Sequence, residues 1–176
     1  MRIISGKYRR KLINPPKNIN ARPTTDFSKE SLFNILNNNF DFKKIKVLDL
    51  FAGTGSISYE FASRGCPEID LVEVNFRHII FIKKTSAELN FNQINAIRNN
   101  TFQFIKFCKS TYDIIFADPP FDLKEIKSIP DLIFEKNLLR KNGWFIIEHS
   151  NKIDFQKFQY FFEKRQYGSV NFSFFK

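Results

Sequence analysis

The chain has 176 residues, a hydrophobic content of 43% and a formal net charge of +10. This length suits one domain with one core, which buries roughly 70% of the surface of the unfolded chain and needs no disulfide or structural metal. The two cysteines lie far apart, which favours a reducing cytoplasm over a disulfide framework. The two histidines lack the spacing of zinc ligands, so we expect no metal site. Without a long apolar stretch or the apolar core of a signal peptide, we expect no membrane span.

The first segment of the chain is strongly basic. Seven Lys and Arg residues precede the first acid, Asp26, and Pro15, Pro16 and Pro23 exclude a helix there. We therefore predict an extended arm over residues 1–24, with short strands, followed by a domain over residues 25–176. The arm is either a solvated basic tail or a grip for nucleic-acid phosphates, with an anionic membrane surface as the second class of partner.

Helices and strands are predicted to alternate along the rest of the chain. A first helix begins with Asp26 as its N-cap and presents Leu32, Phe33, Leu36 and Phe40 on one face. Strands alternating with helices indicate a mostly parallel sheet with helices on both faces. The later strands are predicted at 46–51, 69–74, 96–98, 112–117 and 144–148, the helices at 56–64, 76–90, 102–109, 130–139 and 155–163, and a final hairpin at 165–167 and 170–175.

A glycine loop, Gly53-Thr-Gly55, lies between a predicted strand and a predicted helix. Glycines let the backbone approach a ligand, and the helix N-terminus offers unpaired N–H groups. Glu73 follows about twenty residues later at a strand end, where a carboxylate can accept hydrogen bonds from both hydroxyls of a ribose. NAD and S-adenosylmethionine both carry such a ribose, but Ser58 at the third glycine position weighs against NAD. Glu73 could also be a plain surface carboxylate.

Two other polar residues are candidates near this loop. Asp49 lies within a predicted buried strand, where a carboxylate needs polar partners. Either the ammonium group of a cofactor or the amides of the loop would supply them, and the sequence leaves both open. Asn100 follows the third strand and is placed to meet an adenine amine.

The tetrapeptide Asp118-Pro119-Pro120-Phe121 directly follows the apolar strand 112–117. Asp118 and the Pro119 carbonyl could accept hydrogen bonds from both hydrogens of an aromatic amine, which favours a nitrogen lone pair able to attack a sulfonium methyl group. Rigid prolines fix that carbonyl, and Phe121 would stack on the base. Together with the glycine loop, the motif predicts methyl transfer from S-adenosylmethionine to a nucleobase amine.

These motifs and the N-terminal stretch resemble the RsmD family of bacterial 16S rRNA guanine-N2 methyltransferases over nearly the whole chain. The resemblance is carried by Met1–Arg9, Arg22-Pro-Thr-Thr-Asp26, Glu30–Leu36, Asp49–Ser56 and Asp118–Phe121. Two positions depart from the family's pattern: Arg10 stands where glycine is frequent, and Phe27 where a basic residue is usual.

The resemblance implies a Rossmann-like class I methyltransferase with a seven-stranded, mostly parallel sheet whose last strand is antiparallel. It also implies S-adenosylmethionine as donor and a guanine of 16S rRNA in the small ribosomal subunit as acceptor, and we expect a monomer. Asp118, Pro119, Pro120 and Phe121 are the predicted catalytic residues. The predicted cofactor-binding residues are Asp49, Phe51, Ala52, Gly53, Gly55, Glu73, Val74, Asn100 and Thr101. The predicted RNA-binding residues are Arg2, Lys7, Arg9, Arg10, Lys11, Arg22 and Thr24.

Other functions stay open at this point. The same site could methylate the N6 amine of adenine in a nucleic acid. Glutamine methylation of release factors uses a similar motif but normally with asparagine at the position of Asp118. A non-catalytic rRNA-binding assembly factor is opposed by the presence of Gly53, Gly55, Glu73 and Asp118, and an NAD oxidoreductase by Ser58 and the final hairpin.

Overall fold

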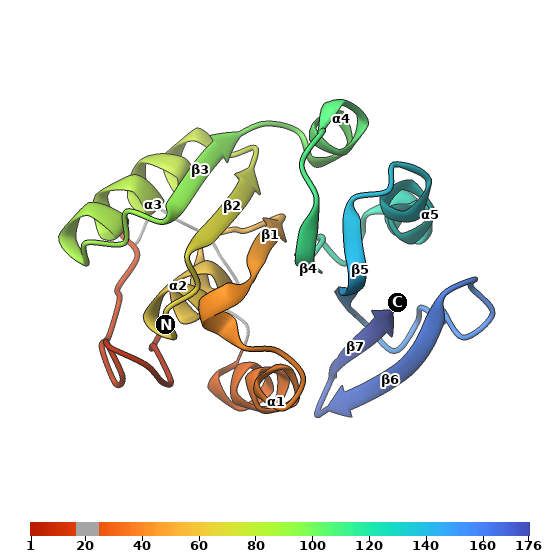
Figure 1. Cartoon of the computed structure of the whole chain (residues 1–176), viewed down its shortest axis with the longest axis horizontal. Coiled ribbons are helices and arrows are strands. Elements are labelled where there is room, and N and C mark those ends of the chain that lie inside the picture. The colour runs from red at the N-terminus through yellow and green to blue at the C-terminus, as the bar shows by residue number, and fades with distance from the viewer. Residues whose placement is uncertain (17–24) are drawn as a thin grey trace.

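The computed structural model describes residues 1–16 and 25–176. Its strands form one sheet of seven in the order β3-β2-β1-β4-β5-β7-β6 (Figure 1). The predictions for Arg22 and Thr24 lie outside the described residues. The strands are β1 (Lys46–Leu50), β2 (Glu68–Glu73), β3 (Ile94–Arg98), β4 (Tyr112–Ala117), β5 (Leu139–His149), β6 (Phe161–Tyr167) and β7 (Val170–Phe175).

The direction of the strands follows the prediction. Strand β1 pairs in parallel with β2 and β4, β2 with β3, and β4 with β5. Strand β7 runs antiparallel to both of its neighbours, β5 and β6. The predicted seven-stranded, mostly parallel sheet with an antiparallel last strand is therefore confirmed.

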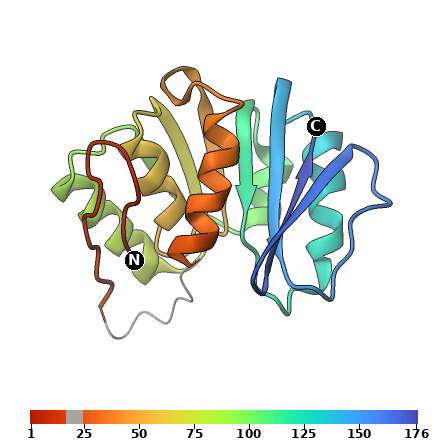
Figure 2. The ribbon, with the colours of Figure 1, turned by 90° about the horizontal axis from the view of Figure 1, so that it is seen from below.

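Helices cover both faces of the sheet. On one face, α1 and α2 pack against the central strands and α3 against β2 and β3, while α4 and α5 cover the other face (Figures 1 and 2). The helices are α1 (Asp26–Asn37), α2 (Ser56–Ser63), α3 (Phe76–Glu88), α4 (Thr101–Phe107) and α5 (Ser128–Glu135), with 3-10 turns η1 (Phe42–Lys44) and η2 (Lys124–Lys127).

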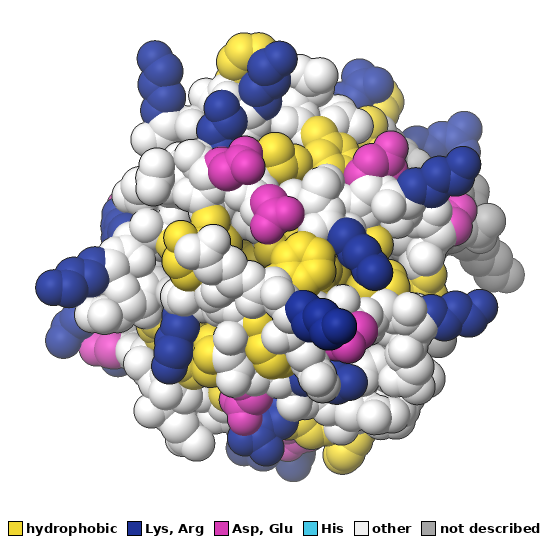
Figure 3. Space-filling model, turned by 90° about the vertical axis from the view of Figure 1, so that its right-hand side faces the viewer, with side chains coloured by type: hydrophobic (Ala, Val, Ile, Leu, Met, Phe, Trp, Pro, Cys, Tyr) yellow, Lys and Arg dark blue, Asp and Glu magenta, His cyan; other side chains and the backbone are white. Residues whose placement is uncertain are grey.

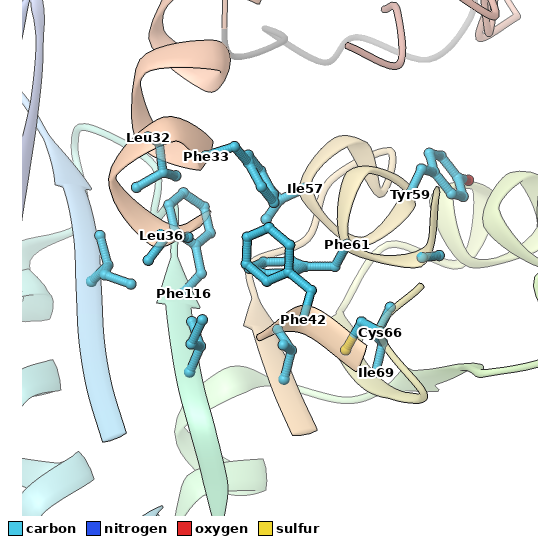
Figure 4. Packing of buried hydrophobic residues seen from close by; sticks show 14 of the residues in the cluster. Leu32, Phe33, Leu36, Phe42, Ile57, Tyr59, Phe61, Cys66, Ile69 and Phe116 are labelled. Carbon is cyan, nitrogen blue, oxygen red and sulfur yellow. The ribbon is translucent and has the colours of Figure 1, made fainter. Parts of the chain in front are cut away.

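Alternation along the strands divides the core into two main layers. In β1, Val47 joins the cluster under α1 and α2, and the next residue, Leu48, joins the cluster under α4 and α5. In the first layer Phe33 of α1 meets Phe61 of α2 with ring centroids 4.6 Å apart (Figure 4). Leu32, Phe33 and Leu36 are fully buried, as the pattern of that helix predicts.

The start of α1 differs from the prediction by one residue. Thr25, not Asp26, is the N-cap: its side chain accepts a hydrogen bond from the Ser28 N–H at 3.1 Å. Asp26 lies in the first turn and pairs with the Arg2 guanidinium at 3.0 Å. A threonine hydroxyl caps a helix as an aspartate carboxylate does, which is why the cap can lie one residue earlier than predicted.

The predicted helix over 155–163 is wrong. Residues 156–160 form turns and a bend, and β6 begins at Phe161. Phe155, Phe158 and Phe161 follow a three-residue spacing that resembles a helical face, but Phe161 and Phe162 pack into opposite layers of the core. Opposite faces for successive residues are a property of a strand, and pairing with β7 satisfies the backbone of this segment.

The start of the predicted arm is docked on the domain rather than extended from it. Residues 1–13, called here the N-terminal hairpin, contain an antiparallel bridge between Arg2 and Leu12, and Ile3 and Ile13 are buried in the core. The Glu60 carboxylate of α2 accepts hydrogen bonds from the Ile4 N–H at 2.7 Å and the Ser5 N–H at 3.0 Å. The hairpin is therefore part of the fold.

Two backbone positions of the hairpin require special conformations. Gly6 has a φ of +81°, and a Cβ there would lie 2.0 Å from the Ser63 carbonyl oxygen of α2. Arg10 has a φ of 70° at the turn, a conformation that glycine adopts without penalty. This explains physically why glycine suits the position of Arg10.

Candidate active site

A pocket of about 450 Å³ opens at the carboxyl edge of the sheet. Strands β1 and β4 are neighbours in register, with Leu50 opposite Ala117, so the loops that follow them leave the edge side by side. The sheet order reverses here, because the chain goes from β1 to β2 on one side and returns to β4 on the other, and such switch points bind ligands. The pocket is lined by Thr25, Phe51, Gly53, Glu73, Val74, Asn75, His78, Asp118, Pro119, Pro120, Phe121, Glu148, Ser169 and Val170.

The glycine loop takes a left-handed backbone at three positions. Phe51, Gly53 and Gly55 have φ values of 57°, 55° and 83°. A Cβ at Gly55 would lie 3.1 Å from the Tyr59 ring, whereas at Gly53 it would meet no atom within 4 Å. Gly55 is thus needed for packing under the loop, and Gly53 leaves space at the pocket wall. Ala52 and Gly55 do not line the pocket.

The Glu73 carboxylate is fixed at the wall of this pocket. Its two oxygens accept hydrogen bonds from the Gly53 N–H at 2.8 Å and the Asn75 N–H at 2.7 Å, and its side chain is largely buried. His78 Nδ1 lies 3.7 Å from it. Each carboxylate oxygen has further acceptor capacity, so Glu73 fits the paired hydroxyls of an adenosine ribose. A plain surface carboxylate would not be held in this way.

Asp49 lies beneath the loop and does not line the pocket. Its Oδ2 accepts hydrogen bonds from the Ser58 hydroxyl at 2.6 Å and the Ser58 N–H at 3.2 Å. Burial is the main cause that raises the pKa of Asp49 to about 7, and the nearby carboxylates Asp118 and Glu73 raise it further. These contacts match the loop-bracing interpretation, while contact with a cofactor ammonium stays a prediction.

Asn100 and Thr101 lie away from the pocket lining. The Asn100 Oδ1 caps α4 and accepts hydrogen bonds from the Phe102 N–H at 3.0 Å and the Gln103 N–H at 3.2 Å. The same oxygen is the atom that an adenine amine would need. The adenine contact therefore stays a prediction, and the N-cap is the role that the structure gives to Asn100.

The four residues of the second motif all line the pocket. Asp118 continues from β4, and its N–H donates to the Leu50 carbonyl at 3.3 Å, which ties the two loops together. Pro119 is buried, while Phe121 is 43% exposed and so presents part of its ring to the solvent side. A carboxylate, a fixed carbonyl and an aromatic ring thus border one cavity with Glu73.

Six lining residues did not emerge from sequence reasoning: Thr25, Asn75, His78, Glu148, Ser169 and Val170. A signal existed for two of them. Asn75 follows Glu73 at the same strand end, and Glu148 is an acid near the end of an apolar strand that neighbours β4 in the sheet. Ser169 and Val170 reach the pocket through the β6–β7 hairpin, which forms the edge of the sheet next to β5. This pairing cannot be read from the sequence around the two residues.

The basic residues of the N-terminal hairpin stay exposed while its backbone is docked. Arg2, Lys7, Arg9, Arg10 and Lys11 are all exposed. The open end of the hairpin lies near the pocket mouth, because Arg2 pairs with Asp26, the residue after the pocket-lining Thr25. Its turn lies at the other end of α2, where Ser63 accepts hydrogen bonds from the Lys7 and Tyr8 N–H groups. Figure 3 shows that Lys and Arg side chains, with fewer acids among them, also surround the side of the molecule formed by α5 and the β6–β7 hairpin.

The described ranges, 1–16 and 25–176, contain no cluster of three or more metal-ligating side chains. Cys66 and Cys108 are free thiols. Within the same ranges, no helix has both the length and the hydropathy required to cross a bilayer.

Comparison with known proteins identifies the family. The profile described as "Conserved hypothetical protein 95" matches residues 1–176. Ribosomal RNA small subunit methyltransferase D of Buchnera aphidicola subsp. Baizongia pistaciae is 36% identical over 154 residues, which cover 88% of this chain and 78% of the relative.

Solved structures share the fold. Hypothetical protein TTHA0928 of Thermus thermophilus superposes with a TM-score of 0.88 at 22% identity, covering 100% of this chain and 99% of that chain. SMU.776, solved in complex with SAH, has a TM-score of 0.68 at 18% identity, covering 86% of this chain and 50% of that one. The chain therefore belongs to the matched family, the RsmD methyltransferases.

Proposed function

We propose that this protein methylates the exocyclic N2 amine of one guanine in the 16S rRNA of the small ribosomal subunit. The observation that carries the proposal is the shared pocket, in which the glycine loop and Glu73 face the same cavity as Asp118, Pro119 and Phe121. At about 450 Å³ the cavity lies within the range of roughly 300–1,000 Å³ that is typical of ligand pockets.

The two ends of the pocket have different tasks in this proposal. Gly53 and Glu73 hold the adenosine portion of the donor, with the Glu73 carboxylate on the ribose hydroxyls. S-adenosylmethionine, when bound, supplies an electrophilic methyl group on a sulfonium. Asp118 and the Pro119 carbonyl accept hydrogen bonds from the two hydrogens of the guanine amine, which orients its lone pair for attack.

Positioning accounts for most of the proposed rate enhancement. Holding the reacting groups in line supplies about 7–11 kcal/mol, and stacking of the flipped base on Phe121 contributes about 1–3 kcal/mol. A strong general base is not needed, because the amine becomes acidic once it is methylated and then loses its proton readily.

The N-terminal hairpin is proposed to hold the RNA. Arg2, Lys7, Arg9, Arg10 and Lys11 are exposed on a docked element that runs from the pocket mouth, at Arg2, to the C-terminal end of α2. Cations in such a position contact phosphates and place the target without reading its sequence. We further propose that the protein acts as a monomer in a reducing cytoplasm, where Cys66 and Cys108 stay thiols.

The test is methylation of small ribosomal subunits from a strain that lacks the gene. Purified protein and S-adenosylmethionine should yield N2-methylguanosine in the digested 16S rRNA, detected by mass spectrometry. Asp118→Ala should abolish most of the product, whereas Asp122→Ala, a matched change at an exposed position outside the pocket lining, should not. N6-methyladenosine as product would favour the adenine alternative, and no methylated nucleoside at all would contradict the proposal.

A further inference from the structure

A second carboxylate stands beside Asp118 at the carboxyl edge of the sheet. Strands β4 and β5 are parallel, with Ala117 opposite Ile147, so the next residues in each strand, Asp118 and Glu148, leave the ladder side by side. Both line the pocket that also contains Phe121. Glu148 is 4% exposed. A largely buried acid therefore faces the part of the cavity that the proposed function gives to the base.

The chemistry of the two purines differs at the atom beside the amine. In guanine the N2 amine is next to N1–H, a hydrogen-bond donor. In adenine the N6 amine is next to N1 with a lone pair, an acceptor. An ionised carboxylate is an acceptor only, so it attracts N1–H and repels the lone pair. Two adjacent carboxylates match the two adjacent donors of guanine.

We propose that Glu148 is a specificity-determining residue whose carboxylate accepts a hydrogen bond from N1–H of the target guanine. Asp118 and the Pro119 carbonyl then hold the N2 amine, and the three acceptors together fix the base in its plane against Phe121. This inference rests on the proposed function and adds the means by which guanine is chosen over adenine. Sites that hydrogen-bond a substrate donor discriminate strongly, because an analogue without it leaves a buried polar group unpaired.

The probe is 2-aminopurine in place of the target guanine in an rRNA substrate. It keeps the amine at the same position but has an unprotonated N1. Wild-type protein should use the 2-aminopurine substrate with a kcat/KM about tenfold to a hundredfold below that for guanine, as expected for loss of a hydrogen bond to a charged group. Glu148→Gln places an amide N–H where it can donate to N1, so the ratio of the 2-aminopurine rate to the guanine rate should rise about tenfold or more.

Controls keep the result specific to this residue. Glu135→Gln, at an exposed position at the other end of the sheet, should leave the ratio unchanged. Affinity for S-adenosylmethionine, measured by calorimetry, checks that each variant is folded. Should Glu148→Gln fail to fold, Glu148→Ala removes the repulsion of the N1 lone pair and should raise the ratio as well.

The outcomes separate this inference from the proposed function. Equal use of guanine and 2-aminopurine by wild-type protein would overturn the inference, whatever the variants do. Discrimination by wild-type protein with an unchanged ratio in the Glu148 variants would overturn it too, and would leave guanine methylation standing. If wild-type protein transferred no methyl group to guanine N2, the proposed function would fail, and the inference with it.

Discussion

At the scale of single residues, Asp49 is the most unusual titratable group of the site. It is buried under the glycine loop and bonded to Ser58, and burial raises its pKa from an ordinary value of 3.8 to about 7. Between these two values the folded state binds more protons than the unfolded state. The contribution of Asp49 to the free energy of unfolding is therefore full below about pH 4 and is lost as the pH rises to about 7, by up to about 1.4 kcal/mol per pH unit.

Asp49→Asn tests this directly, because the amide oxygen can still accept from Ser58 but does not titrate. The free energy of unfolding of wild-type protein minus that of the variant should fall between pH 5 and pH 7 and level off above, as measured by urea titration. Asp131→Asn, on the exposed side of α5, controls for removal of a carboxylate as such. A difference that stays constant over this range would show that Asp49 is ionised throughout.

The sequence singles out Asp49 and Asn100 as polar residues near the site, but it does not show which groups their side chains contact. Asp49 and Asn100 were selected as polar residues near the loop, but their hydrogen bonds go to Ser58 and to the first turn of α4. A polar side chain at a loop can either face a ligand or brace the backbone. Which of the two roles a side chain has depends on the conformation of the loop. That conformation is set by contacts with residues distant in the chain.

At the scale of elements, Glu60 of α2 anchors the N-terminal hairpin. The carboxylate is fully buried, accepts the N–H groups of Ile4 and Ser5, and pairs with Arg64 at 2.8 Å. Glu60→Ala would leave a largely buried guanidinium and two backbone donors without their acceptor. We expect it to lower the free energy of unfolding by about 3–5 kcal/mol and to release the hairpin.

Hydrogen exchange and urea unfolding give the two readouts. In Glu60→Ala the amides of Ile4, Ser5 and Tyr8 should exchange much faster than in wild-type protein. Glu88→Ala, at an exposed helical acid 3.9 Å from Lys84, should change stability by less than about 1 kcal/mol. Unchanged protection of the hairpin amides in Glu60→Ala would mean that burial of Ile3 and Ile13 and the hydrogen bonds to Ser63 hold the hairpin without Glu60.

Helices and strands with a clear hydrophobic pattern could be predicted from the sequence. Segments whose structure depends on pairing with a distant part of the chain could not. Strand β4 was predicted with its observed bounds, 112–117, because it is apolar and flanked by polar residues. The segment 155–163 is predicted as a helix, and the spacing of Phe155, Phe158 and Phe161 is compatible with one. Only pairing with strand β7 shows that Phe161 and Phe162 alternate between the faces of the sheet. Docking of residues 1–13 likewise depends on Glu60, far along the chain.

At the scale of the whole molecule, the net charge of +10 includes a docked basic hairpin that begins near the pocket mouth at Arg2. Substituting Arg9→Gln, Arg10→Asn and Lys11→Gln removes three exposed cations while Asn tolerates the left-handed backbone of position 10. The log–log slope of rRNA affinity against salt should become shallower by about 0.7–0.9 for each lost phosphate contact. Binding is measured with a 16S rRNA fragment over a series of salt concentrations.

The matched control removes the same charge from another part of the surface. Lys44, Lys136 and Lys141 are exposed near the amino ends of β1 and β5, away from the pocket. Their substitution by Gln should alter the slope less than the hairpin variant does. An equal change of slope in both triple variants would show that the hairpin contributes to RNA binding only as one part of a diffuse positive surface.

One half of the pocket is proposed to hold the methyl donor and the other half the acceptor base. Calorimetric titration with S-adenosylmethionine tests this division most directly. Wild-type protein and Asp118→Ala should bind the donor with nearly the same affinity, because Asp118 serves the acceptor base. Glu73→Ala should bind it far more weakly, because the fixed carboxylate on the ribose is gone. No binding by wild-type protein, or a loss in Asp118→Ala as large as that in Glu73→Ala, would contradict this division of the site.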